Sequence, residues 1–258
     1  MTRKLIAFDL DGTLLDDQKH PLPSTLTALR QLEQQGHLLT IATGRTLLYI
    51  EDILAETQLK NYIVCNGSAA FVDGQQLVKE NLNPQVLEHL ITQARALKID
   101  LAVLTLHEIK RLTNFAPEQM TKAMTSFGKA LPDFDAHFAE QHEIYQALAF
   151  FDASMDATFT AEFPAFKFVR WHPYCVDVIP RAGSKAETIM AVAKHEGIAA
   201  ADTIAFGDAL NDLEMIQDAG VGVAMGNASP QIKQVADLVT ADNEHDGIYQ
   251  ALQQLDLI

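Results

Sequence analysis

The stretch Lys4–Thr13 reads KLIAFDLDGT, a short apolar run that ends in an acidic loop. Apolar runs of this length, bounded by turn residues, are typical of buried strands. The loop places Asp9 and Asp11 two residues apart, directly beyond the carboxyl end of that strand. We therefore expect a buried strand that delivers two carboxylates to one edge of a sheet.

Strands and helices alternate on both sides of this stretch. In the N-terminal part we expect a helix with Ser24 as N-cap and Gly36 as its end, a strand over 38–42, a helix over 46–56 and a strand over 62–65. In the C-terminal part we expect helices over 185–195, 213–218, 230–236 and 248–255, with strands over 203–206, 221–224 and 238–239. This alternation predicts an α/β fold with a doubly wound parallel sheet and right-handed crossovers.

The pattern changes in the middle of the chain. Two short apolar runs flank Asp73-Gly74, which is a strong hairpin signal. Beyond it we expect helices over 84–97 and 117–129 and strands over 101–106, 144–151, 165–171 and 175–179, none of which ends in a phosphate-type loop. We therefore predict a second α/β domain over 82–183, inserted into a core made of residues 1–81 and 184–258.

Composition limits the possible partners. The 258 residues are 48% hydrophobic, which excludes a disordered chain, and their net charge of −15 argues against a nucleic-acid partner. No stretch approaches the roughly 20 apolar residues of a membrane span, and the start is too polar for a signal peptide, so we expect a cytoplasmic protein without a membrane partner. Cys65 and Cys175 are expected to be buried thiols rather than a disulfide.

Unusual polar residues follow the predicted core strands or begin a helix. They are Asp9 and Asp11, Thr43, Lys185, and Asp208 with Asn211 and Asp212. Ligands of open α/β sheets bind beyond the carboxyl ends of the strands, so we expect these groups to converge. Three carboxylates in one crevice repel each other unless a cation lies among them, and ligands that are all oxygen favour Mg²⁺.

If the ligand of this site contains phosphate, each of these groups has a role in phosphoryl transfer. A carboxylate can act as a covalent nucleophile, and a cation with a lysine can neutralise a phosphoryl group in transfer. A second carboxylate two residues away can protonate the leaving oxygen. A hydroxyl and backbone N–H groups at Thr43-Gly44 can hold the other phosphoryl oxygens.

The motifs resemble those of a known superfamily. Asp9–Leu15 (DLDGTLL), Ala42–Arg45 (ATGR), Lys185 and Gly207-Asp208-x-x-Asn211-Asp212 are similar, in order and along the whole chain, to the four motifs of the haloacid dehalogenase (HAD) superfamily. Asn66-Gly67 and the large insert resemble its Cof-type branch. The chain differs at Ala186, where the family often has glycine after the lysine. The resemblance implies a Rossmann-like core with an inserted α/β cap domain, whose sheet would be mixed or antiparallel.

The resemblance also implies an activity, that of a Mg²⁺-dependent HAD-type phosphomonoester hydrolase. Asp9 would attack phosphorus to form an aspartyl-phosphate, and Asp11 would protonate the leaving alcohol and then activate water. The expected substrates are small phosphorylated metabolites, such as sugar phosphates or pyridoxal phosphate. We expect the protein to be a monomer or a weak homodimer.

The implied ligands follow residue by residue. Mg²⁺ would be held by the carboxylate of Asp9, the backbone carbonyl of Asp11 and Asp208. Phosphate would be bound by the Leu10 amide, Thr43, Gly44, Asn211 and the fixed charge of Lys185, which also acts in catalysis. Asp212 would support Lys185 or a metal-bound water.

Other activities stay open. A phosphomutase would use the same aspartyl-phosphate but protect it from water. A phosphometabolite-binding regulator would keep the site without the reaction. A signalling receiver also combines an acidic cluster with Thr and Lys, but it is a single small domain and lacks the acid at the position of Asp11.

Several further residues are expected to be structural. Arg45 can pair with substrate or with a core carboxylate, and we favour the carboxylate. Asn66 either faces the site or belongs to a simple turn. For four polar residues of the insert we favour solvated or structural roles over substrate selection: Arg111, Arg170, His172 and Asp177.

Overall fold

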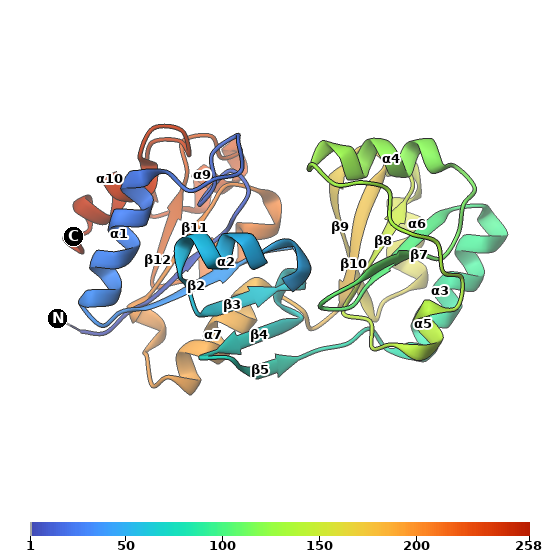
Figure 1. The fold of residues 1–258 in the computed structure, drawn as a ribbon, viewed down its shortest axis with the longest axis horizontal. Coiled ribbons are helices and arrows are strands. Elements are labelled where there is room, and N and C mark those ends of the chain that lie inside the picture. Colours follow the sequence, from blue (N-terminus) through green and yellow to red (C-terminus); the bar gives the residue numbers. More distant parts are fainter. Residues whose placement is uncertain (1) are drawn as a thin grey trace. The chain divides into compact units, whose positions relative to one another are not determined.

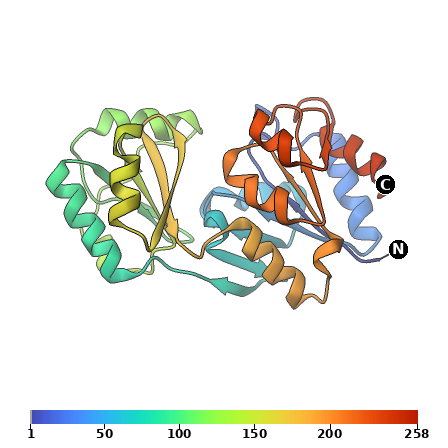
Figure 2. The same cartoon turned by 180° about the vertical axis from the view of Figure 1, so that it is seen from behind.

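The structure, a computed structural model, describes residues 2–258, and their contacts divide them into two compact units. The core unit contains the residues up to Arg45, Tyr49–Lys79 and Ser184–Ile258. The insert unit contains Thr46–Leu48 and Glu80–Gly183. Figures 1 and 2 show the two units from opposite sides.

The core unit is built on an eight-stranded sheet in the order β13-β12-β11-β1-β2-β3-β4-β5. Its strands are β1 (Leu5–Phe8), β2 (Leu38–Ala42), β3 (Asn61–Val64), β4 (Ala69–Val72), β5 (Gln75–Lys79), β11 (Thr203–Gly207), β12 (Val221–Ala224) and β13 (Leu238–Val239). The six strands from β13 to β3 are parallel, and the hairpin β4–β5 continues the sheet in antiparallel fashion. The predicted parallel α/β core is confirmed.

Helices cover both faces of this sheet. They are α1 (Pro23–Gln34), α2 (Glu51–Thr57), α7 (Lys185–His195), α8 (Leu213–Asp218), α9 (Pro230–Val235) and α10 (Gly247–Gln254). Figure 1 shows α1 and α2 in front of the sheet, where α1 also contacts α10. The opposite face, which is turned forward in Figure 2, carries α7 and α8 in contact with each other.

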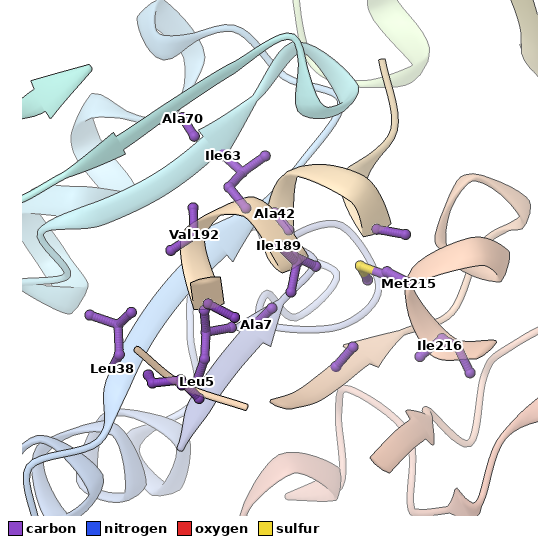
Figure 3. Close-up of a cluster of buried hydrophobic side chains, with 14 of the residues drawn as sticks. Leu5, Ala7, Leu38, Ala42, Ile63, Ala70, Ile189, Val192, Met215 and Ile216 are labelled. Carbon is purple, nitrogen blue, oxygen red and sulfur yellow. The ribbon is translucent and has the colours of Figure 1, made fainter. Parts of the chain in front are cut away.

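Apolar side chains fill the space between the sheet and α7 (Figure 3). Leu5 and Ala7 of β1 point to the same face, because alternate strand residues do, and both are fully buried. They pack with Ile189 of α7 and Met215 of α8. Burial of each large apolar side chain contributes about 1.5–3 kcal/mol. This packing fixes the start of α7 beside the carboxyl end of β1.

The insert unit contains a five-stranded antiparallel sheet in the order β7-β6-β8-β10-β9. Its strands are β6 (Asp100–Leu104), β7 (Ile109–Arg111), β8 (Gln146–Phe150), β9 (Phe166–His172) and β10 (Cys175–Pro180). Its helices are α3 (Pro84–Leu97), α4 (Pro117–Ser126), α5 (Phe138–Gln141) and α6 (Asp156–Glu162). The sheet is therefore antiparallel rather than mixed.

Some local expectations were wrong. Leu22, not Ser24, is the N-cap of α1, because Pro23 occupies the first helical position and the Ser24 hydroxyl donates to Asp246 instead. The helix expected over 46–56 is a 3₁₀ turn (Leu47–Tyr49) followed by the shorter α2. Both cysteines are buried free thiols, as expected. Within residues 2–258, no helix has the length and apolar character needed to cross a membrane.

Candidate active site

The predicted groups come together in the core unit at the carboxyl ends of its parallel strands. Asp9 follows β1, Thr43 follows β2 and Asp208 follows β11, while Lys185 is the first residue of α7. The strands β11, β1 and β2 are neighbours in the sheet, so their three ends lie side by side. The order of the strands therefore places groups from distant parts of the sequence at one edge.

Lys185 lies at the centre of this group. Its Nζ donates to Asp9 Oδ1 at 2.6 Å and to Asp212 Oδ1 at 2.7 Å, and its side chain is 1% exposed. Burial would lower the pKa of Lys185, but the charges of Asp212 and Asp9 outweigh it and raise that pKa. Burial, followed by the charge of Asp212, raises the pKa of Asp9 well above its usual range despite Lys185. The lysine is thus a permanent positive charge beside the predicted nucleophile.

Asp208 and Asp212 share a short loop that follows β11. Asp212 Oδ2 accepts the backbone N–H groups of Asp208 and Ala209, each at 3.0 Å. Thr13 Oγ1 donates to Asp208 Oδ1 at 2.9 Å, which links this loop to the loop after β1. Burial and the neighbouring Asp212 raise the pKa of Asp208 to about 6. Asp212 thus contacts Lys185 through one carboxylate oxygen and the loop backbone through the other.

The carboxylates of this site suit a hard cation. Ligand oxygens of Asp9, Asp208 and Asp212 all lie within 4.8 Å of one another. Their mutual repulsion, which contributes to the raised pKa values of Asp9 and Asp208, is what a bound cation would relieve. A donor set made only of oxygen fits Mg²⁺ rather than zinc.

The carboxylate of Asp11 is held by two basic side chains. Arg45 Nε donates to Asp11 Oδ2 at 2.8 Å, and Arg45 Nη2 donates to Asp11 Oδ1 at 2.6 Å. Lys19 Nζ also donates to Oδ1, at 2.8 Å. Burial would raise the pKa of Asp11, but the hydrogen bonds and charge of Arg45, with those of Lys19, hold it below its usual range. Arg45 thus pairs with a core carboxylate, the role that the sequence favoured.

Three of the residues predicted to bind phosphate, Thr43, Gly44 and Asn211, lie beside Asn66. This asparagine is buried in the left-handed conformation (φ 53°), and its N–H donates to the Thr43 carbonyl at 3.0 Å. Its Oδ1 accepts from Asn211 Nδ2 at 3.3 Å, and a Cβ at Gly44 would lie 3.1 Å from its amide group. Leu10, the other predicted phosphate residue, is fully buried in the loop after β1. Asn66 therefore joins the loop after β2 to the loop after β11.

The four polar residues of the insert have partners inside that unit. Arg170 forms two hydrogen bonds with Asp156, at 2.5 and 3.1 Å. Asp177 accepts from Trp171 Nε1 at 2.8 Å. Arg111 donates to the Pro132 carbonyl at 2.9 Å, and His172 Nδ1 accepts the Tyr174 N–H at 3.2 Å.

Two residues that shape the site were not singled out from the sequence. Thr13 belongs to the DLDGTLL motif, and its place two residues after Asp11 could have indicated a role in the site. Lys19 contacts Asp11 from a turn in which its own φ is +70°, and no sequence pattern indicates that contact. Both residues act on the carboxylates through hydrogen bonds that depend on how the loop after β1 folds.

Comparison with known proteins identifies the family of the chain. The family model of haloacid dehalogenase-like hydrolases matches residues 6–252. The YkrA protein of Bacillus subtilis (strain 168) is 37% identical over 258 residues, covering 100% of both chains. The pyridoxal phosphate phosphatase YbhA of Escherichia coli (strain K12) is 30% identical over 272 residues, covering 97% of both chains.

Solved structures of phosphatases from the same superfamily are also similar to this chain. The HAD subclass IIB sugar phosphatase BT4131 has a TM-score of 0.88 and 27% identity, covering 99% of this chain and 100% of its own. These matches confirm the resemblance indicated by the motifs and the enzyme class that it implied, a phosphomonoester hydrolase. The chain belongs to the family of haloacid dehalogenase-like hydrolases.

Proposed function

We propose that the protein is a Mg²⁺-dependent phosphatase that hydrolyses small phosphomonoesters through an aspartyl-phosphate on Asp9. The observation that carries this proposal is the contact between the buried Asp9 carboxylate and Lys185 Nζ at 2.6 Å, within a cluster of three carboxylates. A carboxylate next to a fixed positive charge can approach a phosphate dianion, whereas three unneutralised carboxylates would repel it.

The proposed reaction has two steps. In the first, an Asp9 oxygen bonds to phosphorus while the ester P–O bond breaks, and Asp11 gives a proton to the departing alcohol oxygen. In the second, the Asp11 carboxylate takes a proton from water as the water attacks the aspartyl-phosphate, which releases phosphate and regenerates Asp9. Asp11 therefore has to be protonated in the first step and ionised in the second, and its lowered pKa favours the ionised form.

Other groups neutralise and orient the phosphoryl oxygens. Mg²⁺, held by the Asp9 carboxylate, the Asp11 backbone carbonyl and Asp208, would supply positive charge to the phosphoryl group. Lys185 adds a second charge, and Asp212 fixes its position. The remaining oxygens would be bound by four groups: the Leu10 amide, Thr43, Gly44 and Asn211.

The substrate class rests on the relatives. One is named for pyridoxal phosphate and another for sugars, and both substrates are small soluble phosphomonoesters. We assign the choice of leaving group to the inserted domain over 82–183, as a cap. We further propose that the protein acts in the cytoplasm as a monomer or weak homodimer, with no nucleic-acid or membrane partner.

The direct test is phosphate release from p-nitrophenyl phosphate and from a panel of sugar phosphates and pyridoxal phosphate. We expect release with Mg²⁺ and its loss with EDTA, restored when Mg²⁺ is added back. No release from the folded protein across the whole panel would overturn the phosphatase proposal. Transfer of the phosphoryl group between two positions of a sugar phosphate, without release of free phosphate, would identify a mutase instead. Binding without turnover would identify a regulator.

Gly12 provides a structural test of the same site. A Cβ at Gly12 would lie 2.5 Å from Asp208 Oδ2, and its φ of +82° disfavours other residues. Gly36 has nearly the same φ, +84°, with nothing within 4 Å of a Cβ. We expect Gly36→Ala to cost about 1 kcal/mol of stability without loss of activity. Gly12→Ala should cost more and lower kcat/KM about 10- to 100-fold by displacing Asp208.

Urea unfolding and steady-state kinetics of the two variants check this comparison. Because the backbone strain is matched, the difference between the two variants reports the clash of the new Cβ with Asp208 and its close contact with Asn227. Equal stability and activity in Gly12→Ala and Gly36→Ala would show that the Asp208 position does not depend on this contact.

A further inference from the structure

Both oxygens of the Asp11 carboxylate are engaged by the same guanidinium. Arg45 Nε binds Oδ2 and Nη2 binds Oδ1, at 2.8 and 2.6 Å. Such paired contacts fix the plane of a carboxylate as well as its distance, because the guanidinium is flat and its donors are parallel. Single contacts leave a carboxylate free to rotate, so this arrangement restricts Asp11 to one orientation.

Arg45 is itself held rigidly. Its backbone N–H donates to Thr43 Oγ1 at 3.1 Å, and its carbonyl accepts the Cys65 N–H at 2.9 Å. Its third side-chain nitrogen, Nη1, donates to the Tyr49 carbonyl at 3.2 Å, and the side chain is only 11% exposed. An anchored guanidinium loses little further entropy when it holds a partner.

Lys19 contacts the same carboxylate in a weaker way. It makes one hydrogen bond, to Asp11 Oδ1, and its side chain is 46% exposed. An exposed lysine contributes little to an ion pair, because water screens the charge and the long side chain loses entropy. Of the two basic residues, Arg45 therefore determines the orientation of Asp11.

We propose that Arg45 is a positioning residue that holds the Asp11 carboxyl group where it meets the leaving oxygen of the substrate. This role rests on the proposed phosphatase reaction, in which Asp11 donates the proton to that oxygen. Displacement of a reacting group by about 1 Å costs on the order of 100-fold in rate, so the orientation of Asp11 has a measurable effect.

The test compares two substrates of the same shape. Phenyl phosphate has a more basic leaving oxygen than p-nitrophenyl phosphate, so its P–O cleavage depends more on a proton from Asp11. The parameter kcat/KM reports the steps up to departure of the alcohol, before the water step. We expect Arg45→Gln to lower kcat/KM for both, with a loss about fivefold or more larger for phenyl phosphate.

A double-mutant cycle with Asp11→Asn shows whether the effect of Arg45→Gln depends on the Asp11 carboxyl group. If Arg45 acts through Asp11, Arg45→Gln should not change the ratio of the two kcat/KM values further once Asp11 is Asn. If Arg45 instead bound substrate directly, its effect would persist in that background. Arg30→Gln, an exposed arginine on α1, is the matched control and should leave both rates unchanged.

The remaining outcomes are also decisive. Equal losses for the two substrates, a gain of activity in Arg45→Gln, or a persistent effect in Asp11→Asn would each overturn the positioning role while leaving the phosphatase intact. An inactive wild type would overturn the phosphatase proposal and this role together. If Arg45→Gln does not fold, Arg45→Lys, which keeps the charge but cannot make the paired contacts, should shift the same ratio in the same direction, and no shift would count against the proposal.

Discussion

Asp9→Asn is expected to lose phosphate release by on the order of 10⁴-fold or more, because an amide cannot form the phosphorylated intermediate. The variant should still fold. Lys185 keeps its contact with Asp212 at 2.7 Å, and the change removes one of three clustered negative charges. The loss would therefore report chemistry and not unfolding.

Two measurements check this expectation. Steady-state release from p-nitrophenyl phosphate gives the loss, and mass spectrometry after rapid acid quench should find one phosphoryl group on wild type and none on Asp9→Asn. Asp17→Asn makes the same change at an exposed carboxylate of the neighbouring loop and should retain full activity. A folded Asp9→Asn variant with a tenth or more of wild-type activity would exclude Asp9 as the nucleophile.

Lys185→Met is expected to inactivate the enzyme and to destabilise it by about 3–5 kcal/mol in EDTA, the usual cost of breaking a buried ion pair from one side. Methionine is apolar and of similar length, so the main change is the lost charge. Asp9 and Asp212 would then remain buried without their cation. Mg²⁺ should recover part of the stability, because it supplies positive charge to the same carboxylates.

Urea unfolding with EDTA and with Mg²⁺ measures both effects. Lys194→Met, in the last turn of the same helix α7, is exposed and should change stability and activity little. If Lys185→Met and Lys194→Met had equal unfolding free energies in EDTA, the buried lysine would not be what stabilises the carboxylate cluster.

Sequence reasoning worked best where periodicity and strand-end chemistry coincided. The strand over 38–42, the helix over 185–195 and the strand over 221–224 have the expected bounds. The sequence alone predicts that Asp9, Thr43 and Asp208 lie close together, because the carboxyl ends of parallel strands meet at one edge of the sheet. Their proposed roles stay predictions, which the variants above test.

The structural features that the sequence did not predict depend mostly on tertiary contacts or belong to short elements. Ser24 is a favourable N-cap residue, but Pro23 in the first turn moved the cap to Leu22. The short elements β7, α5 and α6 have too few residues to show a period. The two hydrogen bonds from Arg45 to Asp11 depend on how the loop after β1 packs against the loop after β2. Neither sequence motif alone predicts that packing.

The pairing of β1 with β11 has a consequence for how the chain is made. Leu5 pairs with Thr203, so two neighbouring strands of the core sheet are separated by almost 200 residues of sequence. Such non-local pairing is slow, and during translation β1 cannot pair with β11 until residues 203–207 have left the ribosome. Residues 80–183, which are contiguous, emerge earlier and can form their own sheet meanwhile. A nascent chain would thus acquire its catalytic centre only after Asp208 and Asp212 have been added to it.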